Sequence, residues 1–208
     1  NRVREQNFSL NGLMGFNLHG KTVGVIGTGK IGKAFCKIML GFGCKVLAYD
    51  PFEDEELKAS GVEYRGFNDL LKLSEIISLH CPLSTENHHL INAQSLKLMG
   101  DKVTLINTSR GGLLKTQDVI QALKTGQIAY LGIDVYEQEE KLFFKDLSGS
   151  IIEDDDIQRL MSFPNVLLTG HQAFFTEDAL AQIASITLNS INELKDGTAP
   201  KDPSVILV

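Results

Sequence analysis

A glycine-rich turn that directly follows a short apolar run constrains the fold of this 208-residue chain more than any other feature. Residues 21–26 are rich in β-branched side chains, which is typical of a buried strand in a parallel sheet. Gly27, Gly29 and Gly32 then follow in the spacing GxGxxG. Gly27 would allow a tight turn, Gly29 would let the backbone approach a pyrophosphate, and Gly32 would let the next helix pack closely on the strand. The pattern predicts a dinucleotide site, although the spacing alone is a weak signal.

An acidic residue at the end of the next expected strand strengthens this interpretation. Residues 44–49 form a second apolar run, and Asp50 ends it, close to the ~20-residue offset expected for a carboxylate that binds the adenosine ribose. We expect Asp50 to accept hydrogen bonds from the ribose hydroxyls and to repel the additional phosphate of NADP, so the preferred cofactor is NAD. The alternative is that Asp50 only opens the turn before Pro51.

Strand-like and helix-like segments alternate along the rest of the chain. Strands are expected at residues 61–64, 76–80, 103–107, 128–133 and 166–169, and helices at residues 68–73, 93–99, 116–124 and 176–194. Such alternation predicts an α/β fold, a Rossmann-type doubly wound parallel sheet with right-handed crossovers. Ligands bind at the carboxyl ends of the strands in sheets of this kind.

Composition argues against two classes of partner. The formal net charge is −6 and the isoelectric point is near 5.4, whereas proteins that bind nucleic acid need a basic surface. No apolar stretch approaches the ~20 residues that span a membrane, and no signal peptide is visible. Cys36, Cys44 and Cys81 are odd in number and lack CxxC spacing, so we expect buried thiols and a reducing compartment, the cytosol.

No metal site is expected from the histidines or from the acidic run. His88 and His89 are adjacent, so they cannot share a helical face, and His19 and His80 show no ligand pattern. The acidic residues 153–156 favour the first turn of a short helix instead.

Three segments far apart in the sequence each end an expected strand with a residue suited to acid, base or anion chemistry. Arg110 presents a planar fork that binds a carboxylate bidentately, and His171 can move a proton near neutral pH. A nearby carboxylate would orient the imidazole ring, but physical reasoning does not choose among Glu137, Glu139 and Glu140. This set suits hydride transfer to a carbonyl beside a carboxylate. The alternatives are a surface arginine, a solvated glutamate and a core histidine.

Together, the segments at residues 27–32, 80–84, 107–111, 134–139 and 170–174 resemble those of the D-isomer-specific 2-hydroxyacid dehydrogenases, and most closely the fermentative D-lactate dehydrogenases. The resemblance runs over essentially the whole chain. The insertion that contains residues 142–144 favours the lactate subgroup over phosphoglycerate or formate relatives. The resemblance implies NAD as cofactor and a small 2-oxo or 2-hydroxy acid, such as pyruvate, as substrate.

The resemblance also implies roles for single residues. Arg110, Glu139 and His171 would take the catalytic roles. Lys30 and Ile31 would lie against the pyrophosphate. The residues expected around the cofactor are Gly27, Thr28, Gly29, Lys30, Ile31, Gly32, Asp50, Cys81, Pro82, Asn87, Thr108, Ser109 and Asp134, of which Thr108 and Asp134 would hold the nicotinamide end. The family often has a bulkier β-branched residue where Cys81 stands, and we expect little consequence from this difference.

The domain organisation is a further implication of the resemblance. Residues 1–179 would form the NAD-binding domain, in which residues 1–20 are an interdomain and dimer arm. Residues 180–208 would form a C-terminal helix and tail that return to a substrate domain. Because the sequence lacks an initiator Met, we expect it to be part of a longer chain. The apolar stretch at residues 8–16 is expected to pack across the two-fold interface of a homodimer.

Two classes of function are therefore compatible with the sequence. The first is an NAD-dependent D-2-hydroxyacid dehydrogenase, expected to be a D-lactate dehydrogenase that reduces pyruvate with NADH, with another 2-oxo acid as the alternative substrate. The second is a non-catalytic NAD-sensing module, because fold alone does not fix function. The combination of Arg110, Glu139 and His171 favours the enzyme.

Overall fold

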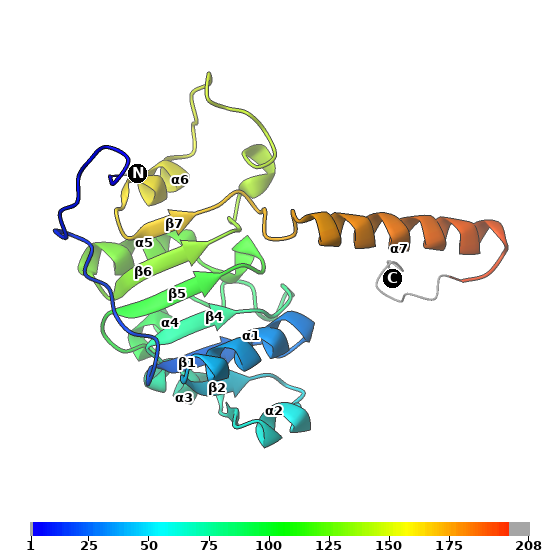
Figure 1. Ribbon diagram of the computed structural model, residues 1–208, viewed down its shortest axis with the longest axis horizontal. Coiled ribbons are helices and arrows are strands. Elements are labelled where there is room, and N and C mark those ends of the chain that lie inside the picture. Colours follow the sequence, from blue (N-terminus) through cyan, green and yellow to red (C-terminus); the bar gives the residue numbers. More distant parts are fainter. Residues whose placement is uncertain (1, 200–208) are drawn as a thin grey trace.

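Seven parallel strands form one sheet in the computed structural model, which describes residues 2–199 (Figure 1). Their order across the sheet is β3-β2-β1-β4-β5-β6-β7. The strands are β1 (Thr22–Ile26), β2 (Lys45–Tyr49), β3 (Glu63–Tyr64), β4 (Ile76–Leu79), β5 (Val103–Asn107), β6 (Ile128–Ile133) and β7 (Val166–Leu168). The strand order reverses between β1 and β4, which is the point where doubly wound sheets bind their ligands. The predicted Rossmann-type fold is confirmed.

The helices cover the sheet in two layers. They are α1 (Lys30–Gly41), α2 (Glu55–Ala59), α3 (Phe67–Leu73), α4 (Ala93–Leu98), α5 (Thr116–Thr125), α6 (Asp155–Ser162) and α7 (Glu177–Lys195), with short 3-10 turns η1 (Gly111–Leu113) and η2 (Glu139–Lys141). Helices α3 to α6 pack on one another along one face, and α1 lies on the opposite face against β1 and β2 (Figure 1). The sequence did not predict α2.

The acidic run begins a helix, as predicted. The side chain of Asp154 accepts hydrogen bonds from the backbone N–H groups of Asp156 and Ile157, and so caps the first turn of α6. Asp155 and Asp156 lie in that first turn, where the positive end of the helix dipole favours negative charge.

Burial differs between the two halves of the sheet. Strands β1 and β4 are buried almost throughout, as parallel strands covered on both faces are. Strand β5 alternates between buried and half-buried positions, β6 mixes buried positions with half-buried and exposed ones, and β7 has no buried residue. The register pairs Thr104 with Tyr130 and Gly132 with Leu167, so these residues share one face. Tyr130 is 44% and Leu167 is 70% exposed, which shows that the helices leave this face open.

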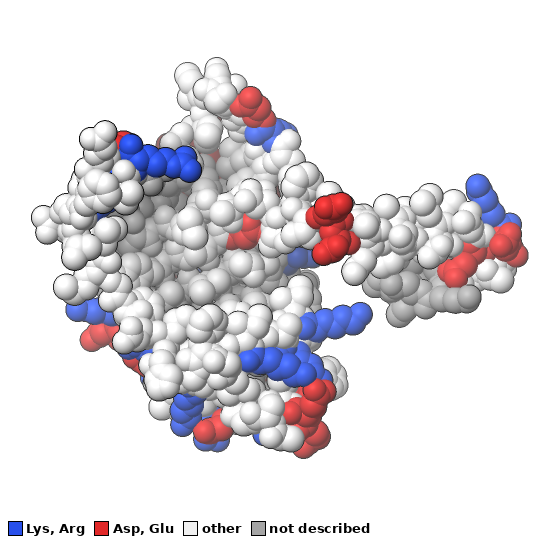
Figure 2. Space-filling model, in the orientation of Figure 1, with Lys and Arg blue, Asp and Glu red and all other residues white. Residues whose placement is uncertain are grey.

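Most of the N-terminal segment and the C-terminal helix lie outside the core, although Leu18 packs against it. Residues 2–20 run along the sheet as an extended arm (Figure 1). Helix α7 projects outward as an isolated helix, which the space-filling view also shows (Figure 2). No residue of α7 is buried, although it carries apolar side chains such as Ile183 and Ile191. The tail that was expected to follow α7 lies partly outside the described residues, which end at 199. None of the described helices is both long and apolar enough to cross a membrane.

Candidate active site

The carboxyl ends of five neighbouring strands lie level with one another. The register pairs Ile26 with Leu79, Leu79 with Asn107, Asn107 with Ile133, and Ile133 with Leu168. The loops after these strands therefore open at a single edge of the sheet. These loops carry most of the residues that the sequence assigned to cofactor and substrate. Asp50 follows β2, whose last residue Tyr49 is paired with Ile26, so it lies at the same edge.

The glycine turn between β1 and α1 has the tight geometry that its sequence predicts. Gly27 has φ +94°, and a Cβ atom there would lie 2.5 Å from the backbone nitrogen of Cys81. A Cβ atom on Gly32 would lie 1.9 Å from the carbonyl oxygen of Gly27. In contrast, a Cβ atom on Gly29 would meet nothing within 4 Å. Gly27 and Gly32 thus serve the packing of the turn, whereas Gly29 keeps an open space free of side chains.

That open space lies at the N-terminus of α1. Gly29 is the N-cap residue, and no side chain caps the helix. The side chains of Lys30 and Ile31 in the first turn are exposed, Ile31 to 72%. Uncapped N–H groups and the helix dipole make this end of the helix suited to a phosphate group.

Asp50 lies beside the glycine turn. Its Oδ2 accepts a hydrogen bond of 2.7 Å from the backbone N–H of Thr28, and its Oδ1 accepts one of 2.9 Å from the N–H of Phe52. The hydroxyl of Tyr64 donates to Oγ1 of Thr28 at 3.0 Å. The carboxylate is therefore held in a fixed position beside the glycine turn, and its remaining lone pairs are available to a ligand.

A cavity of about 450 Å³ extends from Asp50 to the loop after β4. It is lined by Ile26, Gly27, Tyr49, Asp50, Pro51, Phe52, Cys81, Pro82, Ser84, Glu86, Asn87 and Leu90. Asn87 donates to the carbonyl oxygen of Pro82 and accepts from the N–H of Ser84, both at 2.7 Å, so it shapes this wall. Burial raises the pKa of the Cys81 thiol, which keeps it neutral there. The cavity, the open glycine turn and the fixed carboxylate together fit an adenosine dinucleotide.

The loop after β5 presents Arg110 at the surface. Asn107 is fully buried, accepts from the N–H of Ser109 at 3.0 Å and donates to the carbonyl oxygen of Arg110 at 2.9 Å. Ser109 donates to the carbonyl oxygen of Cys81 at 2.5 Å, which ties this loop to the cofactor cavity. Within residues 2–199, Arg110 forms no ion pair, and its Nη1 donates only to the carbonyl oxygen of Ser109. Its guanidinium is therefore available for an anion. Thr108 is also exposed at this edge.

His171 and Glu139 are brought together from segments 32 residues apart. Nδ1 of His171 lies 2.9 Å from Oε1 of Glu139, and Oε2 of Glu139 accepts from the backbone N–H of Tyr136 at 2.9 Å. Glu137 instead contacts His89 and Thr116, and Glu140 is exposed. The geometry therefore selects Glu139, among the three glutamates, as the partner of His171.

Asp134 holds the loop that carries His171. Its carboxylate accepts from the hydroxyl of Thr169 and from the backbone N–H groups of Gln172 and Ala173, at 2.5, 3.0 and 3.0 Å. Burial acts to raise the pKa of Asp134, but these hydrogen bonds outweigh it, so the pKa lies below its ordinary value. His171 itself has φ +54°, an uncommon backbone conformation for a residue other than glycine. Such strain persists only where neighbouring contacts fix it, as Asp134 does here.

Aromatic side chains flank the imidazole. The ring of Phe144 lies 5.8 Å and the ring of Phe174 lies 6.5 Å from that of His171, measured between centroids. The sequence did not place Phe144 at the site. Phe144 belongs to the insertion that precedes α6, and no periodic pattern there indicates where its side chain points.

Comparison with known proteins places the chain in a family. Residues 1–173 match the model of the NAD binding domain of the D-isomer specific 2-hydroxyacid dehydrogenases. The chain is 55% identical to 2-hydroxyacid dehydrogenase A of Aspergillus oryzae over 93% of its length, and 49% identical to D-lactate dehydrogenase of Escherichia coli over 97%. It covers 55% and 61% of those two proteins, so it spans little more than half of these relatives.

Solved structures show the same likeness. The pyruvate reductase of Chlamydomonas reinhardtii superposes with a TM-score of 0.92 at 42% identity, over 97% of this chain and 61% of that one. D-lactate dehydrogenase of Aquifex aeolicus, solved with NAD and lactic acid, superposes with a TM-score of 0.87 at 39% identity, over 94% and 60%. The chain therefore belongs to the D-isomer specific 2-hydroxyacid dehydrogenases, an oxidoreductase family, and contains their NAD binding domain.

Proposed function

We propose that the protein is an NAD-dependent D-lactate dehydrogenase that reduces pyruvate with NADH. The observation that carries this proposal is the 2.9 Å contact between His171 and Glu139 at the strand edge that also presents Arg110. Strands β5 and β7 are two positions apart, about 10 Å at the usual strand spacing. Arg110 and His171 each follow the end of one of these strands by three residues, and we infer that both side chains could reach one small oxo acid.

The substrate carboxylate would bind to Arg110. A guanidinium fork offers two parallel N–H donors to a carboxylate, and hydrogen bonds to charged groups contribute ~1.5–3 kcal/mol each. This contact would orient the 2-oxo group toward the cofactor. When bound, the cofactor supplies the hydride that the reaction requires.

His171 would donate a proton from its Nε2 to the oxygen of the substrate as negative charge develops there, and it would accept that proton in the reverse direction. Its Nδ1 faces Glu139, which fixes the tautomer and the ring plane so that Nε2 is the nitrogen open to substrate. The predicted cofactor residues would act around this pair: the glycine turn with Lys30 and Ile31 at the phosphates, Asp50 at the ribose, and Thr108 with Asp134 at the nicotinamide end.

Steady-state kinetics of the full-length protein would test this function. NADH absorbance should fall when pyruvate is added. The same assay with 2-oxoisocaproate, hydroxypyruvate and glyoxylate would show whether another oxo acid is preferred. Assay of D- and L-lactate in the reverse direction tests the stereochemistry. An NAD-sensing module would bind NADH with no turnover on any of these acids, and that result would overturn the proposal.

We also propose that the protein is a cytoplasmic homodimer assembled through its cofactor domains. The arm exposes Phe8, Leu10 and Met14, the last to 94%, and the open face of β5 to β7 exposes Tyr130 and Leu167. Parallel sheets are normally covered on both faces, so a second copy is a suitable cover. Light scattering that shows only monomer at micromolar concentration would contradict this assembly.

A further inference from the structure

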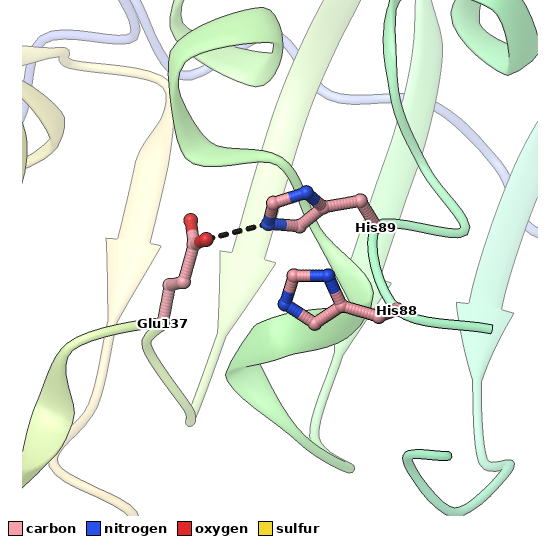
Figure 3. A group of neighbouring side chains, drawn as sticks. All are labelled: His88, His89 and Glu137. Carbon is pink, nitrogen blue, oxygen red and sulfur yellow. Dashed lines mark hydrogen bonds and ion pairs between the residues drawn. The ribbon is translucent and has the colours of Figure 1, made fainter. Parts of the chain in front are cut away.

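Two histidines and a glutamate outside the proposed active site gather into a cluster of possible metal ligands. Each of His88, His89 and Glu137 offers one ligand atom, and these atoms lie within 4.8 Å of one another (Figure 3). His88 and His89 belong to the loop between β4 and α4, and Glu137 belongs to the loop after β6. One ring nitrogen of each histidine lies on the side of Glu137 (Figure 3).

The backbone at His89 makes this arrangement possible. The sequence argument against a metal site was that adjacent histidines cannot share a helical face, but this segment is not helical. His89 has φ +55°, and its N–H donates to the carbonyl oxygen of Gly112 at 2.8 Å. The two rings lie beside each other, with centroids 3.8 Å apart and ring planes tilted by 35°. The premise of the sequence argument therefore does not hold at this position.

Glu137 is held in place from both sides. Its Oε1 lies 2.5 Å from Nε2 of His89, and its Oε2 accepts from the hydroxyl of Thr116 at 2.8 Å. A carboxylate ligand is usually oriented by such an additional hydrogen bond on its second oxygen. Close packing also fixes the backbone beside it, because a Cβ atom on Gly111 would lie 2.5 Å from the nitrogen of Glu137.

The donor set and its spacing suit zinc. Zn²⁺ binds imidazole nitrogen and carboxylate oxygen at about 2.0–2.2 Å, and tetrahedral angles then place two donors about 3.4 Å apart. The shortest distance between two ligand atoms here, 2.5 Å from Nε2 of His89 to Oε1 of Glu137, would increase by about 0.9 Å. The largest distance between two ligand atoms is at most 4.8 Å and would decrease by about 1.4 Å. His88 is exposed, so its side chain can make most of this adjustment by rotation.

We propose that His88, His89 and Glu137 bind one Zn²⁺ ion, with water at the fourth position. The ion would take the place of the hydrogen bond between His89 and Glu137, and would connect the loops after β4 and β6. The site is separate from the proposed acid–base pair, because Glu137 points to His89 whereas Glu139 points to His171. With three protein ligands, we expect micromolar affinity, weaker than that of four-ligand structural sites.

Zinc titration of the purified, chelator-treated protein by calorimetry would test the site. We expect one ion per chain, together with the visible absorption of four-coordinate Co²⁺ when cobalt replaces zinc. His88→Gln is the decisive variant, because His88 is exposed and its loss should leave the fold intact. This variant and Glu137→Gln should each weaken Zn²⁺ binding at least tenfold. His19→Gln, which changes an exposed histidine elsewhere, should leave the affinity unchanged.

Three results would overturn the proposal. The first is that no Zn²⁺ binding is detected at Zn²⁺ concentrations up to 100-fold above the expected micromolar dissociation constant. The second is unchanged binding in His88→Gln, and the third is binding that is lost only in His171→Gln, because the ion would then occupy another site. Retained NADH affinity in each variant shows that the protein is folded, so a loss of zinc binding can be assigned to the missing ligand.

Discussion

Replacing Asp50 with asparagine or alanine should separate its charge from its structural role. The carboxylate accepts from the backbone N–H groups of Thr28 and Phe52, and it lines the cavity that fits the adenosine end of the cofactor. Asp50→Asn keeps one acceptor oxygen and removes the charge, whereas Asp50→Ala removes both. The two variants should therefore agree in cofactor preference and differ in stability.

The expected magnitudes follow from these contacts. A ribose hydroxyl bonded to a carboxylate contributes ~1.5–3 kcal/mol, so both variants should bind NADH about 10- to 150-fold more weakly. Two unit charges 4 Å apart repel by ~4 kcal/mol at an effective dielectric constant of 20, and by ~1 kcal/mol in water. NADPH binding should therefore improve by an amount between these limits. Thr28 is only 7% exposed, so Asp50→Ala also leaves its N–H unsatisfied and should lower the unfolding free energy by ~1–3 kcal/mol.

Fluorescence titration with NADH and NADPH would measure the affinities, and urea unfolding would measure the stability. Asp101→Asn is a matched control, because Asp101 is exposed at the amino edge of the sheet beside β5. An unchanged ratio of NADH to NADPH affinity in both variants would refute the assignment of Asp50 to the ribose. A stability loss without any change in that ratio would show that Asp50 serves only the turn.

Three further predictions concern the strand edge. In the full-length protein, His171→Gln should reduce turnover of the proposed reaction ~10²–10⁴-fold and retain NADH affinity. Arg110→Lys should mainly raise the Michaelis constant for the oxo acid. Near-normal steady-state kinetics in both variants would contradict their roles. Gly32→Ala should abolish NADH binding and lower the free energy of unfolding measured in urea, because the new Cβ would lie 1.9 Å from the carbonyl oxygen of Gly27. Normal NADH binding would show that the turn can relax. The pKa of Asp134 is lowered below its ordinary value of 3.8, so its stabilising contribution is present above that pH and is lost as the pH falls further. The free energy of unfolding, measured in urea at pH 5 and below, should therefore depend less on pH in Asp134→Asn than in the unmodified protein. An equal pH dependence in both would refute this prediction.

Most of the fold was predictable because its signals are local. The apolar runs that became β1, β2 and β4 are bounded by turn residues, and the glycine spacing specified the first turn. Helix α2 was missed because it has only five residues and one buried side chain, Leu57, so no apolar periodicity could develop. The uncovered face of β5 to β7 was also not predicted. Alternation of burial along a strand depends on which neighbours cover the sheet, and a single sequence does not contain that information.

The site was predictable in its residue types but not in its pairing. Glu137, Glu139 and Glu140 lie within four residues and are chemically equivalent, and the resemblance to known dehydrogenases chose Glu139 where physical reasoning did not. In the structure the choice follows from the backbone. The 3-10 turn at Glu139–Lys141 brings Oε2 of Glu139 to the N–H of Tyr136, which leaves Oε1 facing His171. The side chain of Glu137 instead contacts His89 and Thr116.

The same backbone effect explains both histidine sites. His89 and His171 each have a positive φ, at +55° and +54°, and each meets a glutamate from the loop after β6. An L-residue in this conformation costs free energy, so other contacts must hold it there. The N–H of His89 is bonded to Gly112, and the loop of His171 is bonded to Asp134. If these contacts hold the rings, Asp134→Asn should reduce turnover through the orientation of His171 and leave the affinity of the His89 cluster for Zn²⁺ unchanged. Parallel losses at both sites would show instead that the loop after β6 moves as one unit.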